Sequence, residues 1–257
     1  MIISLAQIEV FFFILARIGG VFVQAPIFNS RSFPVSTKVA FAIWLGLVLW
    51  FVTPVSPHLP TNLLSFLLVL IAEIMLGFTI GFICNFLFIA IQSAGELIDM
   101  QMGLSVASAL DPIFGAVISI VGRLTFFVAM IIFFTLNGHH LLLSALHQSF
   151  TSIPAGKIAD FTSFNLLNQI ISLGTALWIT AVKLAGPVLL LIFISDFTFG
   201  IVSRVAPQVN VFMLGFQVKP LLGLFGISLM LPLVVRYINN LIEIMGEQIV
   251  QLLTIIK

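Results

Sequence analysis

A short polar segment in the middle of the chain holds most of the groups that could do chemistry. Gly95 to Pro112 lies between two long apolar stretches, and it carries carboxylates and other hydrogen-bonding side chains at Glu96, Asp99, Gln101, Ser105, Ser108 and Asp111. Burying a carboxylate without a partner has a prohibitive free-energy cost. The segment must therefore face water, a water-filled path or hydrogen-bond donors of another protein.

The first half of this segment is expected to be a helix with one polar face. The spacing i, i+4, i+7 and i+11 places four residues on the same side of a helix, namely Gln92, Glu96, Asp99 and Gly103. The polar face of that helix is formed by Gln92, Glu96 and Asp99. We expect the helix to end near Leu110, because a residue that precedes a proline, here Asp111, is disfavoured in the α conformation.

The second half of the segment is expected to be an irregular loop. Small residues lead into Asp111 and Pro112, and the turn that follows holds Phe114 ahead of Gly115. Irregular backbone at membrane depth is tolerated only where it lines a cavity inside protein. The residues alone leave two interpretations open: a loop inside such a cavity, or an ordinary exposed connection between two spans.

Histidines offer the other possible chemistry, but their spacing does not favour a metal site. His139 and His140 lie two helical turns from His147, too far to share an ion without further ligands, and the chain has no HExxH motif. No serine and histidine stand in a recognisable nucleophile setting. We therefore predict a non-enzymatic protein without cofactors.

Two alternatives of other classes remain at this stage. An intramembrane enzyme would use the histidines. A small-molecule or ion transporter would use Glu96, Asp99 and Arg123 as a relay.

Composition places these groups in a membrane protein. Hydrophobic residues make up 61% of the 257 residues and charged residues only 7%, whereas soluble domains average about 45–50% and about 25%. The mean hydropathy is +1.26. The net charge of +1 and the lack of a lysine or arginine cluster exclude a nucleic-acid-binding role.

The elements that must position the polar segment are apolar helices, and a hydropathy scan predicts about six spans. The apolar stretches cover residues 4–23, 39–55, 63–91, 113–136, 166–195, 221–235 and 241–256. Several are shorter than the roughly 20 residues that a span needs. Proline at position 187 is expected to kink or break its helix.

Charged residues interrupt these apolar stretches at Arg17, Glu73, Arg123, Lys183, Glu243 and Glu247. A charge that faces lipid costs about 2.5–3.5 kcal/mol on insertion scales. We expect many of these segments to pack against partner subunits, and the alternative is that the charges pair inside a monomeric bundle. The motif Gly77-x-x-x-Gly81 lets another helix approach closely.

The chain as a whole resembles the FliR family of type III export apparatus proteins. The resemblance follows the chain in order, through Ala16-Arg17-Ile18-Gly19, the central GELIDMQMGLSVASALDP, Asn137-Gly138-His139-His140, Asp196-Phe197, and Pro207 onward to Lys219. No one motif is decisive, but the ordered set is specific. One departure is Gln217, where family members often have proline after the phenylalanine.

The resemblance implies a subunit of the flagellar protein-export gate in the bacterial inner membrane, at the centre of the basal body. A single copy would join FliP and FliQ in a helical assembly, with FlhB nearby, and unfolded flagellar proteins would pass through its pore. An equivalent subunit of a virulence injectisome is the alternative within this class.

The resemblance also implies an all-α membrane fold of helical hairpins packed into a larger hetero-oligomer. A FliP-like part, residues 1–185, would be joined to a FliQ-like hairpin, residues 186–257, in one integrated structural unit. Its helices would be largely lifted out of the bilayer plane despite their hydropathy.

Carried over to this sequence, the resemblance implies a loop that projects into the pore and plugs it. The loop residues would be Gly103, Ser105, Ser108, Asp111, Pro112, Phe114 and Gly115. Phe114 would act as an apolar plug, and the small residues would let the loop move aside. Contacts with neighbouring subunits are predicted at Arg17, Glu73, Gly77, Gly81, Arg123, Arg204 and Lys219.

Overall fold

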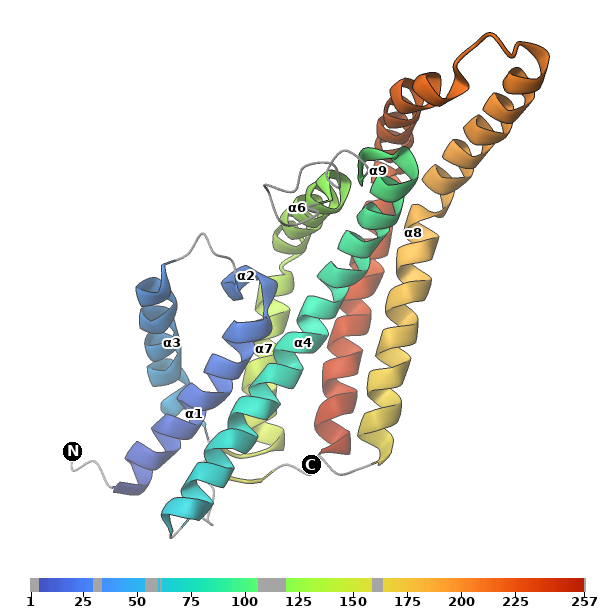
Figure 1. Cartoon of the computed structure of the whole chain (residues 1–257). Helices are drawn as coiled ribbons and strands as arrows, with labels where there is room; N and C mark the ends of the chain where they lie inside the picture. The colour runs from blue at the N-terminus through green and yellow to red at the C-terminus, as the bar shows by residue number, and fades with distance from the viewer. Residues whose placement is uncertain are drawn as a thin grey trace. The chain divides into compact units, whose positions relative to one another are not determined.

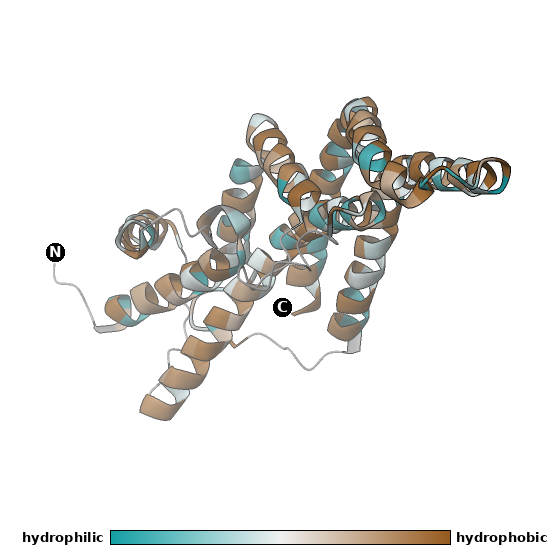
Figure 2. Cartoon of the chain, turned by 45° about the horizontal axis from the view of Figure 1, so that its top comes forward, coloured by the Kyte–Doolittle hydropathy of each residue, from teal (hydrophilic) through white to brown (hydrophobic). Residues whose placement is uncertain are grey.

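The chain is an all-α membrane protein, as predicted. The computed structural model describes residues 5–29, 34–53, 60, 62–105, 119–158 and 164–256, and these ranges contain helices and no strands (Figure 1). Most of the helices are apolar along much of their length (Figure 2). The fold class therefore agrees with the composition.

Four helices are long and apolar enough to cross a bilayer: α1 (Leu5–Gln24), α4 (Leu63–Met102), α8 (Phe164–Val205) and α9 (Val211–Ile255). Helices α6 (Ile120–Thr135) and α7 (Gly138–Ser152) meet at 70° and could together form a fifth span. The short α2 (Pro26–Asn29) follows α1. The described part of the chain thus has four or five candidate spans rather than about six.

Two local features explain the difference in the number of spans. Residues 39–55 fall largely in α3 (Val35–Trp50), which has only 16 residues and is too short to count as a span. Residues 221–235 and all but the last residue of 241–256 belong to one continuous helix, α9. The polar residues between them, such as Arg236 and Asn240, lower the hydropathy but include no glycine or proline that would end a helix.

Prolines do not interrupt the long helices. Helix α8 continues past Pro187, and α9 contains both Pro220 and Pro232. The expected break at Pro187 therefore does not occur. Transmembrane helices tolerate proline where neighbouring groups satisfy the freed backbone atoms.

The chain divides into two compact units, and α4, α8 and α9 contribute to both. Unit 1 consists of Met1–Leu87, Asn137–Leu173 and Ile242–Lys257, and unit 2 of Phe88–Leu136 and Gly174–Leu241. The predicted division into residues 1–185 and 186–257 concerns resemblance to FliP and FliQ rather than compactness, and it stays a prediction.

Within unit 1, α1 and α4 pack so closely that glycines are required at their contact. A Cβ atom on Gly77 would collide with the backbone oxygen of Arg17, and one on Gly81 would lie 2.7 Å from the backbone oxygen of Val21. We expected Gly77 and Gly81 to contact a neighbouring subunit. The structure instead places this small-residue motif against α1 of the same chain, because the motif only permits a close approach and does not select the partner.

This close packing generates a prediction for Gly77→Ala. The added methyl group forces α1 and α4 apart, and overpacking of this kind costs about 1–3 kcal/mol. We expect a lower midpoint of thermal aggregation for the purified chain in detergent.

Gly19→Ala is the matched control, because Gly19 lies on α1, the helix that Gly77 of α4 contacts, and a Cβ atom there meets nothing within 4 Å. Its midpoint should stay unchanged or rise slightly, since alanine is the better helix former. Equal midpoints for the two variants would contradict the predicted close contact.

Candidate functional site

The interior of unit 1 contains an ion pair between α1 and α4. Arg17 Nε donates to Glu73 Oε2 at 2.6 Å, and neither side chain is exposed. Each of these charges interrupts an otherwise apolar helix. Because they face each other, neither has to face lipid or a partner subunit.

Further groups of unit 1 satisfy both partners of this ion pair. Arg17 Nη1 donates to Ser149 Oγ at 3.1 Å, and Arg17 Nη2 donates to the backbone oxygen of Ile153 at 3.0 Å. The guanidinium carbon lies 4.1 Å from the centroid of the Phe150 ring, which adds a cation–π contact. We call Arg17, Glu73, Ser149, Phe150 and Ile153 the Arg17 cluster.

The second oxygen of Glu73 reaches the turn after α7. Glu73 Oε1 accepts from the backbone nitrogen of Gly156 at 3.0 Å. Gly156 has a φ of +96°, a conformation that favours glycine. The ion pair thus joins α1, α4, α7 and this turn, so contacts inside the chain satisfy Arg17 and Glu73, which we had expected to meet partner subunits.

In unit 2, the polar face predicted on α4 separates into an exposed and a buried part. Gln92 and Glu96 are exposed, and Gln92 Nε2 donates to Glu96 Oε1 at 2.9 Å. Asp99 is only 2% exposed, and its Oδ1 accepts from the backbone nitrogen of Val121 at 3.4 Å. Asp99 therefore meets a donor inside the chain rather than water.

Asp99 binds the first turn of α6, where backbone N–H groups lack partners within the helix. A carboxylate is favourable there, because the amino end of a helix carries partial positive charge. Ser119 caps the same end, accepting from the backbone nitrogen of Gly122 at 2.8 Å. Together these contacts hold the start of α6 beside the end of α4.

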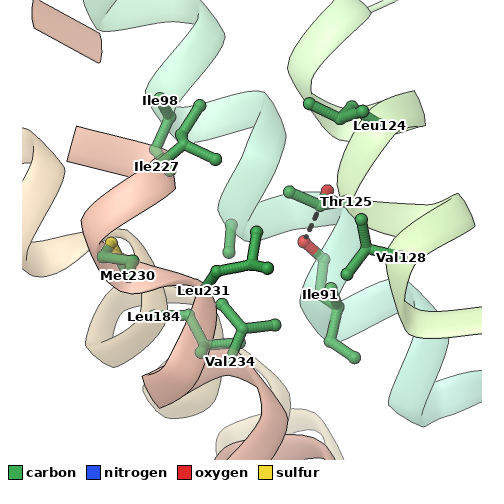
Figure 3. Close-up of a pocket in the computed structure, with 11 residues that line it drawn as sticks. Ile91, Ile98, Leu124, Thr125, Val128, Leu184, Ile227, Met230, Leu231 and Val234 are labelled. Atoms are coloured by element: carbon green, nitrogen blue, oxygen red, sulfur yellow. Dashed lines mark hydrogen bonds between the residues drawn. The ribbon is translucent and has the colours of Figure 1, made fainter. Parts of the chain in front are cut away.

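The two helices approach closely at this point. A Cβ atom on Gly95 would lie 2.6 Å from the Cα atom of Gly122. One turn further along, Thr125 Oγ1 donates to the backbone oxygen of Ile91 at 3.3 Å, and both residues line an apolar pocket of unit 2 (Figure 3). We call the contacts among Gly95, Asp99, Ser119, Val121 and Gly122 the loop base.

Helix α4 ends at Met102, and Leu104 and Ser105 are helical again after Gly103. Gly103 has a φ of +79°, which is left-handed and terminates the helix. Among the predicted plug residues, Gly103 and Ser105 belong to the described part of the chain. The others, Ser108, Asp111, Pro112, Phe114 and Gly115, lie outside the described residues, as does Leu110.

The remaining predicted contact residues are not gathered into this site. Lys219 Nζ on α9 pairs with Asp196 Oδ1 on α8 at 2.6 Å, both within unit 2. Arg123 and Arg204 are exposed. Lys219 thus has a partner inside the chain, and a subunit contact at Arg123 or Arg204 stays a prediction.

Sequence reasoning missed several residues that hold these sites together. Ser149 lies 132 positions from Arg17 and Gly156 lies 83 positions from Glu73, and no local pattern marks either residue. The available signal was weaker: Arg17 and Glu73 have opposite charges and interrupt two apolar stretches, residues 4–23 and 63–91.

The Arg17 cluster generates a prediction from a double-mutant cycle. Glu73→Met leaves Arg17 buried without its counter-ion, which should destabilise the chain by about 3–5 kcal/mol. The double variant Arg17→Met/Glu73→Met removes both charges and keeps apolar volume, so it should be markedly more stable than Glu73→Met alone. The measurement is the thermal aggregation midpoint in detergent. A double variant as unstable as the sum of both single variants would refute direct coupling.

Comparison with known proteins identifies the family. Residues 8–245 match the family described as Bacterial export proteins, family 1. Flagellar biosynthetic protein FliR of Pectobacterium carotovorum is 31% identical over 251 residues, which cover 95% of this chain and 92% of that protein. The protein of the same name from Escherichia coli K12 is 29% identical over 242 residues, covering 92% and 90%.

A relative with a different name also matches. Yop proteins translocation protein T of Yersinia pestis is 28% identical over 207 residues, covering 80% of this chain and 79% of that protein. The FliR resemblance seen in the ordered motifs is thereby confirmed. With a family match that spans most of its length, this chain belongs to the bacterial export proteins, family 1.

Proposed function

We propose that this chain is a non-enzymatic subunit of the flagellar type III export gate. With FliP- and FliQ-like proteins, and with an FlhB-like protein nearby, it would form the channel for unfolded flagellar proteins. One observation carries the proposal: the chain matches proteins named Flagellar biosynthetic protein FliR over nearly the whole length of both. Its place would be the inner membrane at the flagellar basal body.

The exposed surface of unit 2 supports a role as one subunit among several. Large apolar side chains are exposed on α8 and α9 within unit 2, among them Leu190, Phe193, Phe197, Phe212 and Leu229, each at least 60% exposed. An exposed apolar patch of this extent is typical of contact with lipid or with other proteins. In an export gate, neighbouring subunits would cover much of it.

This generates a prediction about assembly. Expressed together with the FliP- and FliQ-like proteins of the same organism, the chain should purify in a stable complex that contains all three. Size-exclusion chromatography with mass measurement would give one copy of this chain per complex. Purification of the chain alone under these conditions would contradict the proposed function.

We further propose that residues 103–115 plug the closed pore, with Phe114 at the tip. The loop base supports this proposal, because it holds the end of α4 and the start of α6 together through Asp99 and Ser119. The connecting residues thus leave from and return to nearly the same place. Such an insertion can extend into a pore without weakening the helices that carry it.

The plug proposal predicts a leak without loss of assembly. Deleting residues 105–115 leaves Asp99, Ser119 and Gly122 in place, so the complex yield should not change. Closed complexes in planar bilayers should then conduct small ions, and Phe114→Ala should give a smaller conductance. A deletion variant that forms the complex and stays sealed would show that another element closes the pore.

The match to a Yersinia translocation protein supports one second candidate, the equivalent subunit of a virulence injectisome. Its lower coverage, 80% of this chain against 92% and 95%, favours the flagellar role. Loss of motility with normal effector secretion, after deletion of the gene, would support the flagellar role. Normal motility with loss of effector secretion would support the injectisome role. The transporter alternative would require transport by the purified chain alone in proteoliposomes.

A further inference from the structure

One face of α8 in unit 2 combines exposed apolar side chains with the cation of Lys183. Six residues share this face at spacings of four, seven, four, three and four positions: Ile179, Lys183, Leu190, Ile194, Phe197 and Ile201. The five apolar members have relative exposures between 48% for Ile179 and 67% for Phe197. We call this set the Lys183 stripe.

The stripe lies opposite the side of α8 that packs within the chain. Ala181, Ala185, Val188 and Ile192 project from the other side of the helix and are fully buried. Val188 is also the nearest contact of a Cβ atom built on Gly226 of α9, at 3.3 Å. The Lys183 stripe therefore points away from the packed interior of unit 2.

The charge of Lys183 is not balanced by an acidic side chain of the described residues. Arg17 pairs with Glu73, and Lys219 pairs with Asp196, but Lys183 is exposed and no acidic side chain of the described residues pairs with it. Its backbone is also affected. Pro187, four positions later, has no N–H, so the carbonyl of Lys183 loses its donor within the helix.

Neither lipid nor water suits the whole stripe. In lipid the apolar side chains would be satisfied, but the ammonium group of Lys183 would be costly. In water the ammonium would be solvated, but five large apolar side chains would be exposed in a row. Only a protein surface that is apolar and carries one well-placed acceptor satisfies both kinds of group.

The position of Lys183 along α8 argues against a lipid phosphate as that acceptor. Lys183 stands near the middle of α8, 19 residues after Phe164 and 22 residues before Val205, which is about 29 Å and about 33 Å of helix. A bilayer centre is about 15 Å from either edge of the hydrocarbon core. The four-carbon stem of lysine cannot cover that distance.

We propose that the Lys183 stripe docks against an apolar helix of another subunit, whose carboxylate at the same depth accepts from the Lys183 ammonium. The identity of the assembly rests on the proposed function, whereas the chemistry of the contact rests on the stripe itself. A second copy of this chain does not fit. Two copies inserted in the same orientation about a two-fold axis bring Lys183 against Lys183, and like charges repel.

The test is assembly of charge variants with the FliP- and FliQ-like proteins of the same organism, all expressed together. Lys183→Met should lower complex yield at least about ten-fold, because it leaves the partner's carboxylate buried without a counter-charge. Lys183→Glu should lower it further, and Lys183→Arg should retain most of it. Arg236→Met, which removes an exposed cation of α9 outside the stripe, is the control and should assemble normally.

The variants should keep the fold of the chain, since Lys183 makes no ion pair within its described part, and unchanged amounts of the chain in the membrane would verify this. If wild type forms the complex and Lys183→Glu forms it equally well, the stripe proposal is wrong while the proposed function stands. If wild type itself forms no complex, the proposed function fails.

A photo-crosslinking amino acid at Phe197 then identifies what covers the stripe. Crosslinks to one partner helix support the proposal, and exchanging its acidic residue for lysine should restore assembly of Lys183→Glu. Crosslinks to lipid alone would overturn the proposal. So would crosslinks to a second copy of this chain.

Discussion

A charge that leaves water must find its counter-charge, and this constraint organises unit 1. Arg17 and Glu73 stand on different helices, both fully buried, and each is tolerable only because of the other. Their remaining hydrogen bonds extend to Ser149, Ile153 and Gly156, so α7 and the turn after it are fixed relative to α1 and α4. Apolar packing alone would hold these helices together, but it would not select this register.

The same principle operates at the loop base with a different counter-charge. Asp99 accepts from the backbone nitrogen of Val121 at the start of α6 and does not meet a cation. The partial positive charge of the helix end acts as its counter-charge. Glycines at positions 95 and 122 allow the approach that this contact needs. In both units, then, small residues set the distance between helices and a polar contact sets their register.

The sequence was enough to predict what depends on local composition, and not what depends on pairing over distance. The all-α membrane class followed from the hydrophobic content, and the family followed from the ordered motifs. The end of α4 at Gly103 could not be predicted, because the sequence does not show which glycine adopts a left-handed conformation, and the predicted end of helicity near Leu110 lies outside the described residues. The hydrogen-bond partners of Arg17 could not be predicted. Ser149 is 132 positions away, and nothing in the local sequence distinguishes a partner inside the chain from one on another subunit. The plug role of the whole segment from Gly103 to Gly115 stays a prediction.

The lengths of α8 and α9 bear on how this protein is made. At 42 and 45 residues they are each about 63–68 Å long, twice the about 30 Å of a hydrocarbon core. An untilted helix of this length cannot lie wholly within lipid, and its apolar exposed faces are unsuited to water. Neither lipid nor water alone therefore suits the whole surface of a newly synthesised copy. Insertion and assembly should be coupled in time, with orphan chains degraded or aggregated rather than stored in the membrane.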